Sequence, residues 1–159
     1  MADNVRLNQG AGGQEIASTD IGGVQFQRVR TLHEDISANI WSAQHVPAAN
    51  TRATITRGAQ AAGIRNVCTW LTIKLVAGAT APTAVNTSFS LIDGASGGTT
   101  YLWRATISLP ATAGADNGIA LSNLWIPGTA ATGMTLEALA AGGANTIESV
   151  SMGGTVISE

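Results

Sequence analysis

The chain of 159 residues has the length of a single domain, and its composition is poor in charge. Only 11% of the residues are charged, compared with about 25% in an average globular protein, and the net charge is −2. Seven arginines and one lysine, Lys74, provide no basic field for phosphates, so we expect no direct binding to nucleic acid. Because 45% of the residues are apolar, we expect the chain to fold rather than to stay disordered.

Targeting and membrane segments are not expected from the sequence. The first residues lack the apolar run of a signal peptide, and no stretch approaches the roughly eighteen apolar residues of a membrane-spanning helix. We therefore expect neither export by a signal peptide nor contact with a membrane. The single cysteine, Cys68, lies in an apolar run, which predicts a buried thiol that forms no disulfide and no zinc site.

Residues 1–36 are predicted to form an extended N-terminal arm with one short strand. From Met1 to about Asp20 the sequence is rich in Asn, Gln and Gly, with too little apolar surface to offset the entropy of ordering, so we expect this part to be mobile on its own. The alternating residues from Ile21 to Arg30 favour a short strand. Ile36 to Val46 shows interrupted helical spacing before Pro47, and we expect a connector there.

Residues 37–159 are predicted to form the main domain, in which apolar and polar residues alternate with a period of two. Turn residues separate the runs, and no useful helical period occurs between them, which excludes parallel α/β folds. The sequence therefore predicts an all-β, two-sheet antiparallel sandwich of jelly-roll or immunoglobulin-like topology. With the arm strand there are about eight strands, and those of the sandwich are Thr51–Arg57, Val67–Ala77, Thr87–Ile92, Thr99–Leu109, Ile119–Ile126, Met134–Ala140 and Thr146–Ile157.

The tryptophans lie in different sequence patterns. Trp103 shares the apolar face of its predicted strand with Ile107 and Leu109, which predicts a core position. Trp70 falls on the face opposite the apolar residues of its strand, and Trp125 lies close to a proline. We expect these two in the core as well, and their alternative roles are as interface aromatics or as rings that stack on a glycan.

One catalytic motif is matched in form only. Gly94-Ala95-Ser96-Gly97-Gly98 fits the G-x-S-x-G nucleophile elbow, but a predicted strand follows where the elbow requires a helix. Both histidines, His33 and His45, also precede the serine, whereas the triad histidine of that family follows it. We therefore expect Ser96 to lie in a hairpin turn.

The remaining titratable residues do not form a convincing site. His33, Glu34 and Asp35 are adjacent, and neighbouring residues of an extended chain point to opposite sides, so we expect a solvated polar patch; a metal or pH-sensitive site is the alternative. The acidic residues expected singly near turns are Asp93, Asp116 and Glu137. The prediction is a protein that is not an enzyme, with no catalytic residue, no cofactor and no metal.

A segment near the N-terminus resembles small virion proteins of tailed bacteriophages. It runs from Gly10 to Arg30 and contains a glycine-rich lead, the phrase Asp20-Ile21-Gly22-Gly23 and the ending Phe26-Gln27-Arg28-Val29. The Ala/Thr/Gly-rich strands after Ala48 are also similar to the β-sandwich of such proteins. The resemblance implies a structural protein, most similar to a capsid decoration (cement) protein on the exterior of the virion, made in the cytoplasm of the bacterial host.

The resemblance also implies the partners. These are the major capsid protein and neighbouring copies of the chain in a homo-oligomer, for which a trimer is one arrangement. A tail, baseplate or receptor-binding module of the same kind of particle is the alternative role. The arm residues expected to bind the partner are Ile21, Val24, Phe26, Arg28, Val29 and Arg30.

Overall fold

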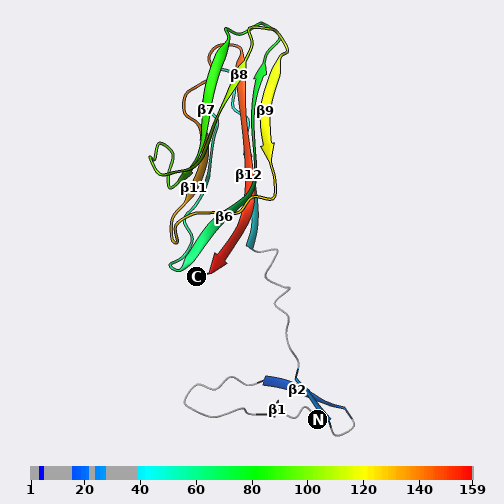
Figure 1. Ribbon diagram of the computed structural model, residues 1–159. Helices are drawn as coiled ribbons and strands as arrows, with labels where there is room; N and C mark the ends of the chain where they lie inside the picture. Colours follow the sequence, from blue (N-terminus) through cyan, green and yellow to red (C-terminus); the bar gives the residue numbers. More distant parts are fainter. Residues whose placement is uncertain (1–3, 6–15, 22–23, 28–38, 159) are drawn as a thin grey trace. The chain divides into compact units, whose positions relative to one another are not determined.

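The computed structural model describes residues 4–5, 16–21, 24–27 and 39–158 (Figure 1). The chain divides into two compact units, Met1–Ile36 and Ser37–Glu159. Within the described ranges, no helix is long and apolar enough to cross a membrane.

The first unit contains a three-stranded antiparallel sheet in the order β1-β2-β3. β1 (Asn4–Val5) pairs with β2 (Ile16–Ile21), and β2 pairs with β3 (Val24–Gln27). The prediction of one strand from Ile21 to Arg30 was wrong, because Ile21 ends β2 and pairs with Val24 at the start of β3. Two glycines between alternating runs are the sequence signal of a hairpin, and Gly22 and Gly23 separate these strands.

The second unit is a β-sandwich of two antiparallel sheets, as the sequence predicts. One sheet has the order β10-β6-β12-β4, and β9 pairs with β6 on the same side as β10. Its longest pair joins β6 and β12. The strands of this sheet are β4 (Ile40–His45), β6 (Ile64–Ala77), β9 (Asp116–Leu121), β10 (Ile126–Pro127) and β12 (Thr146–Ser158).

The other sheet has the order β5-β11-β7-β8. Its strands are β5 (Thr54–Arg57), β7 (Val85–Asp93), β8 (Tyr101–Leu109) and β11 (Met134–Ala138). The connections after β6 and after β8 pass from one sheet to the other (Figure 1). The connector expected between Ile36 and Val46 is instead the strand β4 over residues 40–45. Its alternation was hidden because Ile40 is exposed while its neighbour Trp41 is buried.

The core lies between the two sheets and follows the period of two. β6 contributes Leu71, Ile73 and Leu75, all fully buried, and β11 contributes Leu136. Cys68 is buried and free of disulfide bonds, and burial raises the pKa of its thiol to about 11. On β8 burial increases along the strand, so that Ile107 and Leu109 are buried while Trp103 is half-buried against the core.

Two glycines of β12 allow a close approach of the backbone of β6. The register of the β6–β12 pair shifts between Gly153 and Gly154. A Cβ on Gly154 would lie 1.8 Å from the carbonyl oxygen of Val67, and a Cβ on Gly153 would lie 2.5 Å from Nε1 of Trp70. Only glycine therefore fits at position 154, and the indole of Trp70 lies directly over Gly153.

Candidate functional site

A glycine-rich loop, Gly94–Gly98, lies over the outer face of the β5-β11-β7-β8 sheet; we call it the flap. It connects β7 and β8, as predicted for Ser96, and a strand rather than a helix follows it. Beneath the flap lies Glu137 of β11, whose register partners are Thr54 on β5 and Ser90 on β7. Its neighbours Leu136 and Ala138 face the core, so Glu137 faces outward, and yet it is fully buried.

The Glu137 carboxylate anchors the flap. The Ser96 hydroxyl donates to Oε2, and the Gly97 amide donates to Oε1 at 3.1 Å. Nη2 of Arg52 lies 3.6 Å from Oε2 and donates to the Ser96 hydroxyl at 2.8 Å. Both carboxylate oxygens therefore accept a hydrogen bond from the flap, and these bonds tie the flap to β11. Glu137 was expected near a turn of its own segment, but it lies within β11, and the turn whose Gly97 amide donates to it is the distant flap.

A second carboxylate, which the sequence analysis did not single out, lies inside the sandwich. Glu148 of β12 is fully buried, and its Oε2 accepts a hydrogen bond of 2.8 Å from the Ala53 amide. Burial raises the pKa of this carboxyl, and the Ala53 hydrogen bond and the nearby Arg52 charge oppose that shift. The two residues directly before β5 thus each contact a buried carboxylate. Arg52 lies beside Glu137, and Ala53 donates to Glu148.

The other two acidic residues that were predicted near turns are there. Asp93 ends β7, and its carboxylate accepts hydrogen bonds from the amide of Thr129 at 3.0 Å and from its hydroxyl at 2.5 Å. Asp116 begins β9 and forms an ion pair of 2.6 Å with Lys74. Both residues tie neighbouring segments together, and neither belongs to a group of three or more His, Cys, Asp or Glu side chains in the described part of the chain.

The candidate metal or pH-sensitive cluster falls largely outside the description. His33, Glu34 and Asp35 are not among the described residues. Nδ1 of His45 accepts a hydrogen bond of 3.1 Å from the Thr54 amide, which bridges the two sheets between β4 and β5. Residues 39–158 contain no group of three or more His, Cys, Asp or Glu side chains that would hold a metal ion.

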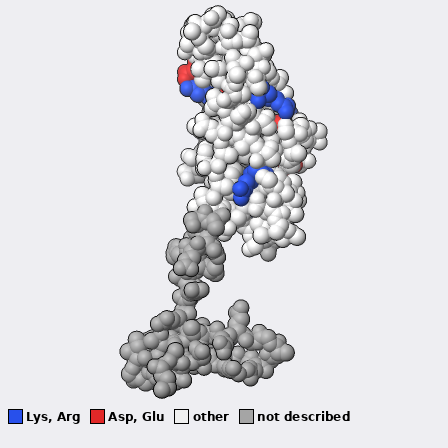
Figure 2. All heavy atoms as spheres, turned by 180° about the vertical axis from the view of Figure 1, so that it is seen from behind, with Lys and Arg blue, Asp and Glu red and all other residues white. Residues whose placement is uncertain are grey.

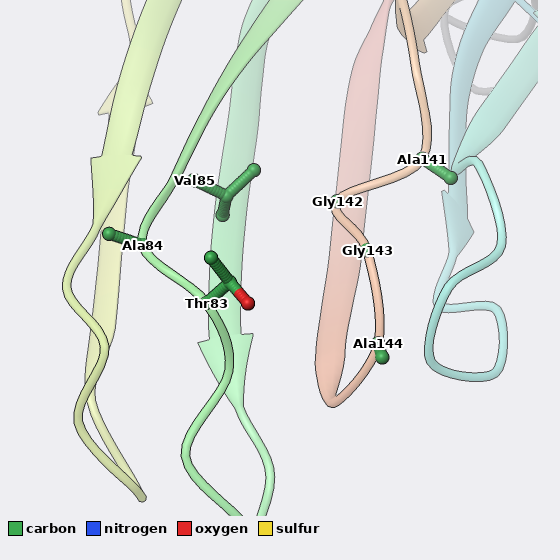
Figure 3. A pocket seen from close by; sticks show the side chains of 7 residues that line it. All are labelled: Thr83, Ala84, Val85, Ala141, Gly142, Gly143 and Ala144. Carbon is green, nitrogen blue, oxygen red and sulfur yellow. The ribbon is translucent and has the colours of Figure 1, made fainter.

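One cavity of about 260 Å³ opens at an end of the sandwich, between the start of β7 and the loop before β12 (Figure 3). Its lining contains only small or uncharged residues: Thr83, Ala84, Val85, Ala141, Gly142, Gly143 and Ala144. Such a lining supplies neither a charge nor a convergent set of polar side chains for orienting a small substrate.

The candidate interface aromatics differ in exposure. Trp125, between β9 and β10, has 63% of its surface exposed. Trp70 is half-buried, as its position over Gly153 requires. Figure 2 shows one face of the sandwich, on which uncharged residues predominate and charged groups are few. The face in Figure 2 therefore offers few charged groups for binding a charged ligand.

The arm residues predicted to bind a partner are only partly described. Ile21 is the last residue of β2, and Val24 and Phe26 belong to β3, where Phe26 pairs with Thr19. Arg28, Val29 and Arg30 lie outside the described residues. Among the described strands β3 has one neighbour, β2, and is therefore an edge of its sheet.

No protein-family model and no curated protein matches the chain. Among solved structures, a chain in a structure described as "Structure of infectious bursal disease virus Gt strain" is similar at 18% identity, over 94% of this chain and 40% of that one, with a TM-score of 0.22. The chain thus spans less than half the length of that protein. At this TM-score the two backbones share too little geometry to support an inference about fold or role.

Proposed function

We propose that the chain is a structural protein of a tailed-bacteriophage particle that binds the outside of the capsid and stabilises it. The observation that carries the proposal is the division of the chain at residue 36. The segment that resembles phage virion proteins falls in a small unit with its own sheet, and the sandwich forms a second unit with its own core. Such a division suits an attachment segment joined to an outward-facing domain.

The attachment would use backbone pairing and apolar contact. β3 is an edge strand among the described strands, and an edge strand pairs readily with a strand of another protein. The segment from Ile21 to Gln27 contains no charged residue. Salt weakens contacts between exposed charges, so an uncharged contact of this kind resists it.

Binding would stabilise the capsid by mass action. A protein that binds the assembled lattice but not its separated subunits favours the lattice in proportion to the logarithm of its free concentration over its dissociation constant. The contacts would be with the major capsid protein and with neighbouring copies of the chain. The site of action is the capsid exterior, after synthesis in the cytoplasm of the bacterial host.

The proposal is tested by the release of DNA from heated particles. Particles that lack the protein should release DNA at a lower temperature than complete particles, and the added full chain should restore the threshold, also in about 1 M NaCl, where the Debye length is only about 3 Å. A variant chain with lysines in place of Val24 and Phe26 should fail to restore it. Equal thresholds with and without the protein would contradict the proposal.

A second candidate role is a tail, baseplate or receptor-binding module, which the exposure of Trp125 favours. Exposed indole rings stack on sugar rings and serve as contact anchors. In this case depleted particles would keep their heat stability but adsorb poorly to host cells, and Trp125→Ala would reproduce the poor adsorption.

A further inference from the structure

The strand β4 leaves one of its sides open. Among the described strands it pairs with β12 alone, which makes it an edge of its sheet. At the opposite side of the sandwich, the Asn117 side chain donates to the carbonyl of Ser108 and links β9 to β8. On the side where β4 meets β5, the His45 ring accepts a hydrogen bond from the Thr54 amide, and the Arg57 guanidinium of β5 lies 5.8 Å from the centre of the Trp41 ring. Among the described strands, none pairs with the open side of β4.

β4 also lacks the features that normally protect an edge strand from pairing. Exposed edges usually carry a charged residue, a proline or a bulge. Ile40 to Val46 contains no Lys, Arg, Asp, Glu or Pro, and the pairing of β4 with β12 runs without a register shift. Proteins that leave a flat edge unprotected expose it to another strand.

The outward row of this segment has apolar ends. Ile40, Ser42, Gln44 and Val46 alternate with Trp41 and Ala43, which face the core. Ile40 is 61% exposed and Val46 is 51% exposed. They are two of the four exposed large hydrophobic residues in the part of the chain that the structure describes, and they lie six positions apart on one row.

We propose that β4 pairs with β4 of a second copy, antiparallel about a twofold axis, so that the two sheets join into one. In an antiparallel pair, opposite side chains lie on the same face of the sheet. The axis must therefore pass midway between the two copies of one residue. If that residue is Ala43, Ile40 lies opposite the partner subunit's Val46, and Ser42 lies opposite the partner subunit's Gln44. A register centred on Ser42 would instead set the exposed Ile40 opposite the polar Gln44 of the partner subunit.

Because of the twofold symmetry, the pair of Ile40 and Val46 occurs two times and covers the exposed aliphatic side chains of both copies. The uncharged pair of Ser42 and Gln44 also occurs two times and lies between the aliphatic pairs. The contact is isologous, because the same strand is used on both sides. The inference concerns association of the chain in solution and stands whether or not the protein attaches to a capsid.

Two double variants of the full chain test the register. In Ser42→Lys with Gln44→Lys, the introduced lysines of one copy face those of the other, and like charges directly opposite destabilise a strand pair. In Ser42→Lys with Gln44→Glu, each lysine faces a glutamate, so this variant changes the same two positions without repulsion. We expect a wild-type dimer in analytical ultracentrifugation, at least about tenfold weaker association of the first variant, and association close to wild type in the second.

The outcomes separate cleanly. A wild-type chain that remains monomeric up to about 1 mM would overturn the inference, and so would an assembly that both variants leave intact or weaken equally. A variant with both Ser42→Cys and Gln44→Cys provides a measurement that does not depend on the lysines. Under oxidising conditions it should form a cross-linked dimer, since Cys68 is buried and does not compete. Absence of the cross-link would also overturn the inference.

Discussion

Replacing Glu137 tests whether the buried carboxylate holds the flap on the sandwich. Glu137→Ala removes the acceptor for the Ser96 hydroxyl and the Gly97 amide, and the ion-pair partner of Arg52. Glu137→Gln has the same shape, and its amide oxygen still accepts a bond from Gly97. The amide nitrogen, however, cannot accept from Ser96 and carries no charge for Arg52.

The magnitude follows from these contacts. A hydrogen bond to a charged group contributes about 1.5 to 3 kcal/mol, and two such bonds are lost in Glu137→Ala. The ion pair adds at most about 1 kcal/mol, because 40% of the Arg52 side chain is exposed to solvent. Since the freed Ser96 and Arg52 groups regain water, we expect Glu137→Ala to cost about 3 kcal/mol and Glu137→Gln about 1 to 2 kcal/mol.

Urea unfolding followed by tryptophan fluorescence measures the global effect, and hydrogen exchange measures the local one. The Gly97 amide should lose protection in Glu137→Ala and keep most of it in Glu137→Gln, while the amides of β12 change only with global stability. Ser96→Ala removes only the hydroxyl bond to Glu137 and should cost about 1.5 kcal/mol, about half as much as Glu137→Ala. A cost below about 1 kcal/mol for Glu137→Ala, or equal costs for Ala and Gln, would refute the anchoring role.

Four further changes have defined outcomes. Gly154→Ala should destabilise the sandwich by about 3 kcal/mol or more, because its Cβ would overlap the Val67 carbonyl. Its control is Gly58→Ala, which has open space around the new Cβ and should be nearly neutral in the same urea assay. Glu148→Gln should gain stability relative to the wild type as the pH rises from about 4.5. Folding raises the pKa of Glu148, so the wild-type carboxyl stabilises the native state below its unfolded pKa and loses that contribution as the pH rises above it. Parallel pH profiles of the two proteins would contradict this prediction. Trp103→Ala should cost about 2 to 3 kcal/mol, since the ring is only half-buried, and a calorimetric loss near zero would show that this face contributes nothing to the core. Removal of residues 1–36 should leave a cooperative thermal transition in residues 37–159 and abolish particle binding, and a lost transition would show that the two units fold together.

The sandwich was predictable where burial follows the period of two. Leu71, Ile73 and Leu75 face the core on β6, and Val150 and Met152 do so on β12, as alternation requires. These positions are apolar because both sheets bury one face against the other. The β2–β3 hairpin was missed because alternation was followed through Gly22 and Gly23, although the glycine pair is itself a turn signal.

The buried polar network was not predictable from local patterns. Glu137 meets Ser96 across 41 residues of sequence, and Glu148 meets Ala53 across 95. A carboxylate in a strand is normally taken to face solvent, and only the tertiary fold brings the donors that allow its burial. The strand β4 was missed because its outer row begins with the exposed Ile40 instead of a polar residue.

Electron cryomicroscopy of purified phage particles that carry a labelled copy of the full chain tests the proposed role most directly. The account predicts labelled density on the outer surface of the capsid, repeated with the symmetry of the lattice, and its loss when residues 1–36 are removed from the labelled chain. Label confined to the tail or baseplate, or absent from the particle, would contradict it.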